Sequence, residues 1–367
     1  MRLLVAGGGT GGHLFPGIAI ADEVARRGNG NQILFVGTSR GIETRAVPAA
    51  GYALETLEVS GLKRVGLAAT LRGLWRLPLA GIRSVRILRR FRPDVVVGVG
   101  GYASGPLVLA ASLLGYATAI QEQNSVPGIT NRILGRLVRA VLIAFDDAAR
   151  FFPASKLKRL GNPVRHAIVT ALEDASVKQA GKAASTEGLR ILVVGGSQGA
   201  RAVSDLVVDA VGKLASDGIA FSVVHQSGAA DCERVEERYR SLGLRVHVTV
   251  RPFIDDMATA YAEADLVVAR AGALTLAELA ISGTPAILVP LPTAADDHQS
   301  KNAARFAEAG AARVLDQRKA SADDLAQAIA ELAKNEEKRS GMAKAMRTLA
   351  RPRAAADIVD CLQSLAG

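Results

Sequence analysis

A glycine-rich loop near the N-terminus constrains this chain more than any other stretch. It reads Gly7-Gly8-Gly9-Thr10-Gly11-Gly12-His13, follows the apolar run Leu3 to Ala6 and precedes a helical pattern that begins near Pro16. This order predicts a strand, a tight loop and a helix. Backbone without side-chain bulk can approach a ligand closely, and a helix N-terminus offers unpaired N–H groups and a positive dipole end. The loop therefore predicts an anion site, with phosphate as the first candidate.

The same glycines match the dinucleotide pattern only in part. Gly7, Gly9 and Gly12 satisfy G-x-G-x-x-G, but that pattern also requires an acidic residue at the end of the second strand. The second predicted strand, Gln32 to Gly37, runs instead into Thr38-Ser39-Arg40. Hydroxyl groups and an arginine suit a 2′-phosphate and not a free ribose diol. NAD is therefore disfavoured, and an NADP-dependent Rossmann oxidoreductase stays as the alternative function.

His13 closes the loop and is the first candidate for chemistry. A histidine titrates near neutrality and can accept a proton from a hydroxyl group. The competing interpretation is a histidine that only caps the helix or fills the core. We favour the catalytic role because His13 follows the carboxyl end of the first strand, where open α/β sheets bind their ligands.

Length and composition indicate two α/β domains in a reducing compartment. The chain has 367 residues, 37 glycines and 49% apolar residues, which suits two packed cores. Its two cysteines, Cys232 and Cys361, match no metal-binding or redox spacing, so we expect no disulfide. We expect no signal peptide, and the longest apolar stretch, Pro106 to Ile120, is too short to span a bilayer.

Positive charge is concentrated in the N-terminal half. Residues 1–162 hold 21 Lys and Arg against 9 Asp and Glu, and the segment from Lys63 to Arg92 contains no acidic residue at all. Its bases alternate with leucines and one tryptophan, so the segment predicts an amphipathic surface for anionic lipid. Nucleic acid would also be attracted, but the aromatic residues needed to stack bases are missing. A solvated helix face is the remaining interpretation.

Strand-like and helical runs alternate along both halves, which predicts parallel, doubly wound sheets. In the first half, the expected strands are Leu3 to Ala6, Gln32 to Gly37, Leu54 to Val59, Asp94 to Val99, Thr118 to Gln121 and Val141 to Phe145. A second glycine loop follows at Gly98 to Pro106, and a polar cluster follows at Gln121 to Gly128. Both stand at the edge where a ligand is expected, although the polar cluster is as easily a helix cap.

The pattern restarts near Gly161-Asn162-Pro163, where we place the domain hinge. The strand Arg190 to Val194 enters another glycine loop, Gly195 to Ala200, so the second half repeats the opening arrangement. Further strands are expected at Phe221 to Gln226, Val246 to Val250, Leu266 to Ala269 and Ala286 to Val289. Glu278, expected one turn inside a helix, could accept both hydroxyls of a ribose, while Gly272 to Thr275 offer N–H groups to a diphosphate. The loop Pro290 to Asn302 carries polar residues suited to sugar hydroxyls.

Taken together, these stretches resemble the MurG family of GT-B glycosyltransferases over essentially the full length. The motifs that carry the resemblance are Gly8-Gly9-Thr10-Gly11-Gly12-His13, Gly101-Tyr102-Ala103-Ser104-Gly105-Pro106, Glu122-Gln123-Asn124, Gly161-Asn162-Pro163-Val164-Arg165, Gly195-Gly196-Ser197-Gln198-Gly199-Ala200, Phe253-Ile254-Asp255-Asp256-Met257, Arg270-Ala271-Gly272-Ala273-Leu274-Thr275 with Glu278, and His298-Gln299. The chain departs from the family at Asp297-His298, in a stretch that varies within the family.

The resemblance implies an inverting transfer of N-acetylglucosamine from UDP-GlcNAc to the C4 hydroxyl of the muramoyl sugar of lipid I. The product is lipid II, a precursor of peptidoglycan. The implied fold is GT-B, with two Rossmann-like doubly wound parallel-sheet domains facing across a cleft. Residues 1–162 would bind acceptor and membrane, with a helix at 351–367 packing back on them, and residues 163–350 would bind the donor.

The resemblance also implies roles for individual residues. Donor contacts fall on Thr10, Gly11, Gly12, Asn124, Arg165, Ser197, Ile254, Ala273, Leu274, Thr275, Leu276, Ala277, Glu278 and Gln299. Acceptor and membrane contacts fall on Tyr102, Ser104, Leu71, Leu74, Trp75 and Leu79. His13 or Glu122 would be the general base, and the sequence does not rank them. No metal or cofactor is implied, since no Asp-x-Asp motif stands at a strand end.

The implied partners are UDP-GlcNAc, lipid I, anionic membrane lipids and other proteins of cell-wall synthesis and division, with no nucleic acid. The implied location is the cytoplasmic face of the bacterial inner membrane, with peripheral attachment.

Overall fold

The chain divides into two compact units, each built on its own parallel sheet. In this computed structural model, unit 1 comprises Met1–His166 with Arg351–Gly367, and unit 2 comprises Ala167–Ala350. The structure describes residues 1–28, 30–59, 67–179, 188–196, 199–243 and 246–367. For residues 67–77 and 175–179 only the backbone is described, and the side chain of Ala295 is likewise outside the description.

Unit 1 contains a seven-stranded parallel sheet with the strand order β3-β2-β1-β4-β5-β6-β7. Its elements are β1 (Arg2–Gly7), α1 (Gly11–Arg26), β2 (Gln32–Thr38), α2 (Glu43–Ala49), β3 (Ala53–Leu57), α3 (Leu67–Phe91), β4 (Val95–Gly100), α4 (Ser104–Leu113), β5 (Ala117–Glu122), α5 (Ile129–Leu134), β6 (Ala140–Ile143), the 3₁₀ turns η1 (Asp146–Phe151) and η2 (Ala154–Lys156), β7 (Leu157–Arg159), and α14 (Ala354–Ala366).

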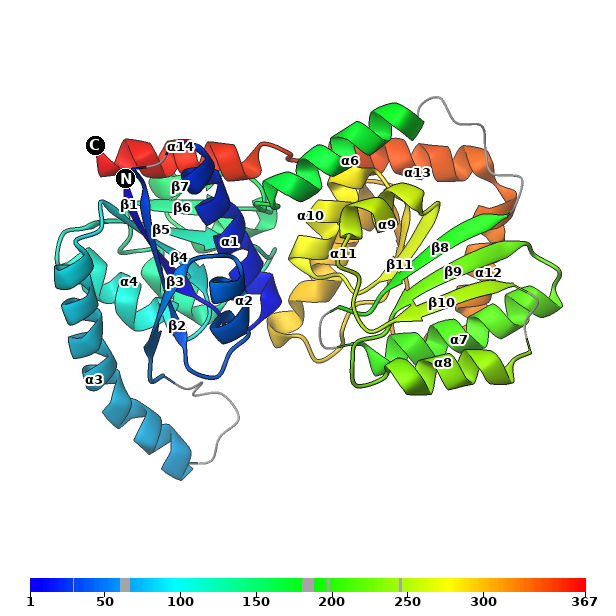
Figure 1. The fold of residues 1–367 in the computed structure, drawn as a ribbon, viewed down its shortest axis with the longest axis horizontal. Coiled ribbons are helices and arrows are strands. Elements are labelled where there is room, and N and C mark those ends of the chain that lie inside the picture. The colour runs from blue at the N-terminus through cyan, green and yellow to red at the C-terminus, as the bar shows by residue number, and fades with distance from the viewer. Residues whose placement is uncertain (29, 60–66, 180–187, 197–198, 244–245) are drawn as a thin grey trace. The chain divides into compact units, whose positions relative to one another are not determined.

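Helices cover both faces of this sheet because its strands are apolar on both sides. Side chains of α1, α2 and α14 share one core with Leu3, Val5 and Phe35. Those of α3, α4 and α5 share a second core with Leu4 and Val96 on the other face. Figure 1 shows α14, the last helix of the chain, in unit 1, where it packs against α1, β4 and β5.

Unit 2 contains a six-stranded parallel sheet with the order β10-β9-β8-β11-β12-β13. Its elements are α6 (His166–Gln179), β8 (Leu189–Val194), α7 (Arg201–Ser216), β9 (Phe221–Gln226), α8 (Cys232–Ser241), β10 (His247–Arg251), α9 (Met257–Glu263), β11 (Leu266–Ala269), α10 (Ala273–Ser282), β12 (Ala286–Leu288), η3 (Ala295–Asp297), α11 (His298–Glu308), β13 (Ala312–Val314), α12 (Ala322–Lys334) and α13 (Glu336–Thr348). Its main core lies between the sheet and helices α7, α8 and α12.

The parallel, doubly wound architecture predicted from the sequence is confirmed, with local differences. The first helix begins at Gly11, so Pro16 lies inside it and does not mark its start. β3 ends at Leu57 and β6 ends at Ile143, each two residues before the predicted end. β7 and β13 were not predicted, because these short edge strands are largely exposed and lack the apolar run of the equally short β12. No described helix is both long and apolar enough to cross a membrane.

A buried polar chain crosses the core of unit 2. The ring of His225 in β9 bonds to the hydroxyl of Ser204 through Nε2 at 3.1 Å and to the hydroxyl of Tyr239 through Nδ1 at 3.0 Å. All three side chains are buried, so this serine and histidine face no solvent and form a structural pair. Burial lowers the pKa of His225 to about 4.

We predict that this histidine makes unit 2 sensitive to acid. Below pH 6.5 the side chain of His225 becomes protonated in the unfolded chain but stays neutral in the folded protein. The free energy of unfolding therefore falls by about 3 kcal/mol between pH 6.5 and about 4. Urea unfolding at several pH values should show a shallower loss for His225→Gln. The exposed His247→Gln is the control. Equal slopes for wild type and His225→Gln would contradict the prediction.

Candidate active site

The predicted residues of unit 1 lie at the carboxyl ends of its central strands. β1 has β2 on one side and β4 on the other, so the strand order reverses at this strand. Parallel sheets bind ligands in the crevice at such a reversal. The carboxyl ends of β1, β4 and β5 lie at one edge, and at or just after them stand Thr10 to His13, Tyr102, Ser104, Glu122 and Asn124.

Two glycine loops pack directly against each other at this edge. The amide of Gly8 donates to the carbonyl of Gly100 at 3.3 Å. A Cβ atom on Gly7 would stand 2.4 Å from that carbonyl oxygen, and one on Gly101 would stand 2.3 Å from the carbonyl oxygen of Gly8. The contact is therefore possible only between glycines, because any side chain would overlap backbone.

His13, in the first turn of α1, is oriented by an amide. Its Nδ1 lies 3.0 Å from Oε1 of Gln123. Nε2 of Gln123 donates to the carbonyl oxygens of Val99 at 2.9 Å and Gln121 at 3.3 Å, so Oε1 is the atom turned toward the ring. Nδ1 must then carry the proton, and the lone pair of the neutral imidazole is on Nε2. Burial lowers the pKa of His13, although the bond to Gln123 opposes this.

Thr10 and Arg165 lie beside the same helix. Thr10 is the N-cap residue of α1, but its hydroxyl makes no cap hydrogen bond, and its side chain and Gly12 are exposed. The guanidinium of Arg165 stands 5.7 Å from the ring centroid of Phe15 in α1. The N-terminus of α1 therefore presents exposed backbone, a hydroxyl and a cation at one place.

Glu122 lies at the end of β5 but turns toward the other face of the sheet. Its Oε2 accepts from Nδ2 of Asn131 in α5 at 2.8 Å, and its Oε1 accepts from the amide of Asn124 at 3.0 Å. The residue is buried, and burial raises its pKa against the effect of these hydrogen bonds. Glu122 thus orders the loop that follows it, including Asn124.

The second glycine loop contains one exposed and one buried member of the predicted acceptor set. Tyr102 is 55% exposed, whereas Ser104 is fully buried. A Cβ atom on Gly98 would stand 2.5 Å from the hydroxyl oxygen of Ser104, so this side chain fills the space under Gly98. Tyr102 is the member of the loop that can meet a ligand.

The predicted donor residues of unit 2 gather around the start of α10. Gly272 is its N-cap residue, and Ala273 to Glu278 form its first six residues. Glu278 is therefore more than one turn inside the helix, deeper than predicted. The hydroxyl of the buried Tyr261 donates to Oε2 of Glu278 at 3.1 Å and orients the carboxylate. Sequence reasoning missed Tyr261, since nothing in the pattern pairs it with Glu278.

A half-buried arginine connects the two donor loops of unit 2. Nη1 of Arg270 donates to the carbonyl oxygens of Val289 at 3.0 Å and Pro290 at 3.2 Å, and burial lowers its pKa. Oε1 of Gln299 accepts from the amide of Leu291 at 3.0 Å, which leaves its NH₂ group as the end suited to a sugar hydroxyl. Asp296 has a φ of 52° and Asp297 a φ of 54°, so this loop holds two residues in the left-handed region.

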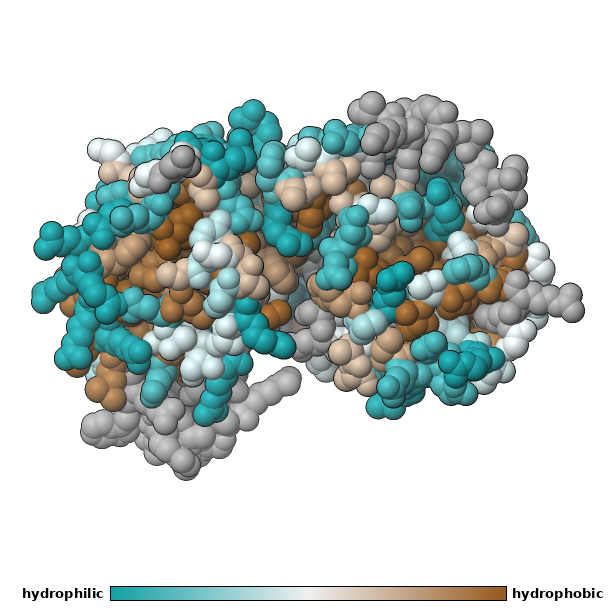
Figure 2. Space-filling view, in the orientation of Figure 1, coloured by the Kyte–Doolittle hydropathy of each residue, from teal (hydrophilic) through white to brown (hydrophobic). Residues whose placement is uncertain are grey.

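The remaining donor residues are placed differently. Ile254 is only 8% exposed and lines a pocket of about 500 Å³ on the sheet face of β8, β9 and β10, where Figure 2 shows apolar residues. Ser197 lies outside the described residues. A larger pocket, about 1220 Å³, lies where β8 and β11 begin, at the edge opposite to the predicted donor loops.

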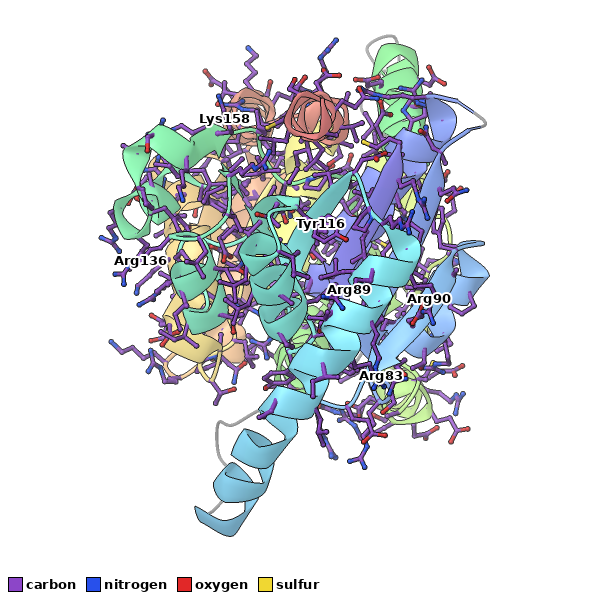
Figure 3. The ribbon with its side chains drawn as sticks, turned by 90° about the vertical axis from the view of Figure 1, so that its left-hand side faces the viewer. Arg83, Arg89, Arg90, Tyr116, Arg136 and Lys158 are labelled. Atoms are coloured by element: carbon purple, nitrogen blue, oxygen red, sulfur yellow. The ribbon has the colours of Figure 1, made fainter. Side chains whose placement is uncertain are left out.

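The face of unit 1 formed by α3, α4 and α5 combines exposed apolar side chains with arginines. We call it the basic apolar face. Leu79 in α3 is 66% exposed and Leu113 in α4 is 75% exposed. Figure 3 looks onto this side and shows Arg83, Arg89 and Arg90 on α3. The other large apolar side chains exposed there are Ile82, Leu109, Leu114, Ile129, Ile133 and Leu137. The side chains of Leu71, Leu74 and Trp75 lie outside the description.

The two parallel sheets, together with the family models that match them, place the chain among the GT-B glycosyltransferases. The glycosyltransferase family 28 N-terminal domain matches residues 3–143, and the glycosyltransferase family 28 C-terminal domain matches residues 190–358. The chain belongs to glycosyltransferase family 28. The oxidoreductase alternative finds no support among its relatives.

Similar proteins extend this result over the full length. The UDP-N-acetylglucosamine--N-acetylmuramyl-(pentapeptide) pyrophosphoryl-undecaprenol N-acetylglucosamine transferase of Anaeromyxobacter dehalogenans is 50% identical, over 100% of this chain and 93% of its own. The protein of the same name from Myxococcus xanthus is 48% identical over 98% of this chain and 92% of its own. The crystal structure of Acinetobacter baumannii MurG superposes with a TM-score of 0.80 at 32% identity, over 99% of both chains.

Proposed function

We propose that this protein transfers N-acetylglucosamine from UDP-GlcNAc to the C4 hydroxyl of the muramoyl sugar of lipid I, forming lipid II and UDP in peptidoglycan synthesis. One observation carries the proposal: half of the residues are identical, over the whole chain, to an enzyme named for this transfer. The loops at both sheet edges supply groups suited to each part of the reaction.

His13 is the proposed general base. Its neutral ring carries a lone pair on Nε2, because Gln123 holds the proton on Nδ1. The C4 oxygen of the acceptor attacks the anomeric carbon from the side opposite the leaving UDP, so the configuration inverts. Nε2 takes the hydroxyl proton, and UDP leaves with the electron pair of the broken bond. Glu122 is the less suitable base because both of its oxygens already accept hydrogen bonds in a buried place.

The donor is assigned mainly to unit 2. Glu278 would accept the ribose hydroxyls, and the N-terminus of α10 would meet the charge that develops on the diphosphate without a metal. Among the described residues, no group of three or more His, Cys, Asp or Glu could hold a metal ion. Gln299 would contact the sugar, and Thr10 to Gly12, Asn124, Arg165 and Ile254 keep their proposed donor roles, as does Ser197 from the resemblance alone.

The acceptor is assigned to unit 1, and its lipid carrier suggests attachment to the cytoplasmic face of the inner membrane. The basic apolar face suits such a surface, since its arginines would meet anionic headgroups while its leucines and isoleucines enter the interface. Tyr102, exposed on the second glycine loop, is the proposed acceptor contact at the sheet edge that also carries His13.

Loss of the base should remove turnover and leave donor binding intact. His13→Ala is expected to lower kcat by ~10²–10⁴-fold, with the Kd for UDP nearly unchanged. Because burial lowers the pKa of His13, kcat/KM of the wild type should fall only as the pH drops below the usual 6.5. Steady-state kinetics on a soluble lipid I analogue measures both. Near-normal turnover of His13→Ala, beside an inactive Glu122→Gln enzyme that still binds UDP, would transfer the role to the carboxylate.

Glu278→Ala is expected to weaken binding of UDP-GlcNAc by ~1.5–3 kcal/mol, because it removes a charge-assisted acceptor for the ribose. Tyr261→Phe keeps the ring and removes only the hydroxyl that orients Glu278, so its loss should be smaller, ~0.5–1.5 kcal/mol. Calorimetric titration with UDP and UDP-GlcNAc gives both values. Wild-type affinity in Glu278→Ala would make this carboxylate purely structural.

Binding to vesicles should depend on both components of the basic apolar face. The double variant Leu79→Ser and Leu113→Ser is expected to bind anionic vesicles about tenfold more weakly, because apolar contact is lost. Added salt should weaken binding of the wild type, because each basic residue near the surface contributes about 1 kcal/mol. Leu242→Ser, at an exposed leucine of unit 2, is the matched control. If the fraction of protein that sediments with vesicles is unchanged by salt, by anionic lipid and by the double variant, this face is not the membrane contact.

A further inference from the structure

Glu43 is a fully buried carboxylate under the first glycine loop that none of the steps above uses. It stands at the start of α2, and three donors converge on it. Oε2 accepts from the amide of Gly9 at 2.7 Å. Oε1 accepts from the amide of Thr38 at 2.8 Å and from its hydroxyl at 2.7 Å. Among the described residues, no Lys, Arg or His forms an ion pair with Glu43.

The surrounding backbone is shaped to admit this carboxylate. A Cβ atom placed on Gly8 would come within 2.5 Å of the carboxyl carbon of Glu43, and one on Gly37 would come within 2.6 Å of its Cγ. A Cβ atom on Gly41 would overlap the carboxyl group even more closely. Three glycines, one in the first glycine loop, one in β2 and one in the loop after β2, therefore leave room for this side chain.

The amide of Gly9 is the kind of group that glycine loops offer to phosphate. Here it is already bonded to a carboxylate of the same chain. We propose that Glu43 is an internal anion that stands in for phosphate at the first glycine loop, and that it is a positioning residue for Thr10 to His13. A phosphate at the amide of Gly9 would meet this carboxylate and be repelled, so Thr10 to His13 are the part of the loop left to meet substrate.

The electrostatics of the site agree with a permanent anion. Burial opposes the charge, but the amides of Gly9, Thr38 and Glu43 itself and the hydroxyl of Thr38 outweigh it and hold the pKa of Glu43 below its usual value. The carboxylate of Glu43 is therefore ionised at neutral pH. The link to His13 is short: Gly9 precedes the N-cap Thr10, whose carbonyl accepts from the amide of His13 at 3.2 Å.

The test uses a substitution that breaks one contact and keeps the others. In Glu43→Gln, the side-chain oxygen can replace Oε1 and keep both hydrogen bonds from Thr38. The NH₂ group then faces the N–H of Gly9, and because both groups are donors this hydrogen bond is lost. We expect kcat on a soluble lipid I analogue to fall at least about tenfold, since small shifts of a base are costly, while the Kd for UDP stays within about twofold. Thr38→Val, which removes only the hydroxyl bond, is the matched control and should keep kcat within about threefold.

A merely structural Glu43 predicts another result: a lower melting temperature with unchanged kcat per folded enzyme, and this outcome would overturn the proposal. If Glu43→Gln folds poorly, Glu43→Asp keeps the charge but withdraws it from Gly9 by one methylene. A similar loss of kcat then supports the proposal and wild-type kcat overturns it. The inference rests on the proposed function, but wild-type transfer and the His13→Ala assay test that function separately.

Discussion

The backbone contact between the two glycine loops of unit 1 is the constraint on which its candidate site depends. Gly7 and Gly8 lie against Gly100 and Gly101 so closely that a Cβ atom at Gly7 or Gly101 would overlap a carbonyl oxygen. This approach brings the start of α1 next to the end of β4. The same crowding reaches the catalytic candidate, because a Cβ atom on Gly100 would stand 2.9 Å from Nδ1 of His13. Glycine at these positions is thus a requirement of packing as well as of backbone angle.

The sequence predicted the strands and the edge at which the site lies, because long buried parallel strands carry a strong apolar signal and end in glycine loops. It could not predict which side chains meet across that edge. Gln123 stood in a recognised polar cluster, yet its bond to His13 joins residues 110 positions apart. Glu43 and Tyr261 gave no local signal, since each acts through a partner on another element.

The same limit applies to the basic apolar face. The charge pattern of Lys63 to Arg92 predicted an amphipathic surface, but a one-dimensional pattern describes one helix at a time. In the fold, α4 packs against α3 and α5 packs against α4. Both helices contribute exposed apolar side chains, such as Leu113 and Ile133. A surface of this kind is wider than the segment that suggested it, and its apolar part is not confined to the basic helix.

Two buried carboxylates flank the glycine loops of unit 1, and a different property disfavours each of them as a base. Glu43 receives two backbone amides and a hydroxyl, which hold its pKa low and make it a weak base. Burial outweighs the donors at Glu122 and raises its pKa, which makes it a stronger base. Both oxygens of Glu122, however, already accept hydrogen bonds, from Asn124 and Asn131, on the other face of the sheet. Glu122 lacks access and Glu43 lacks basicity, and both facts favour the imidazole of His13 as the proposed base.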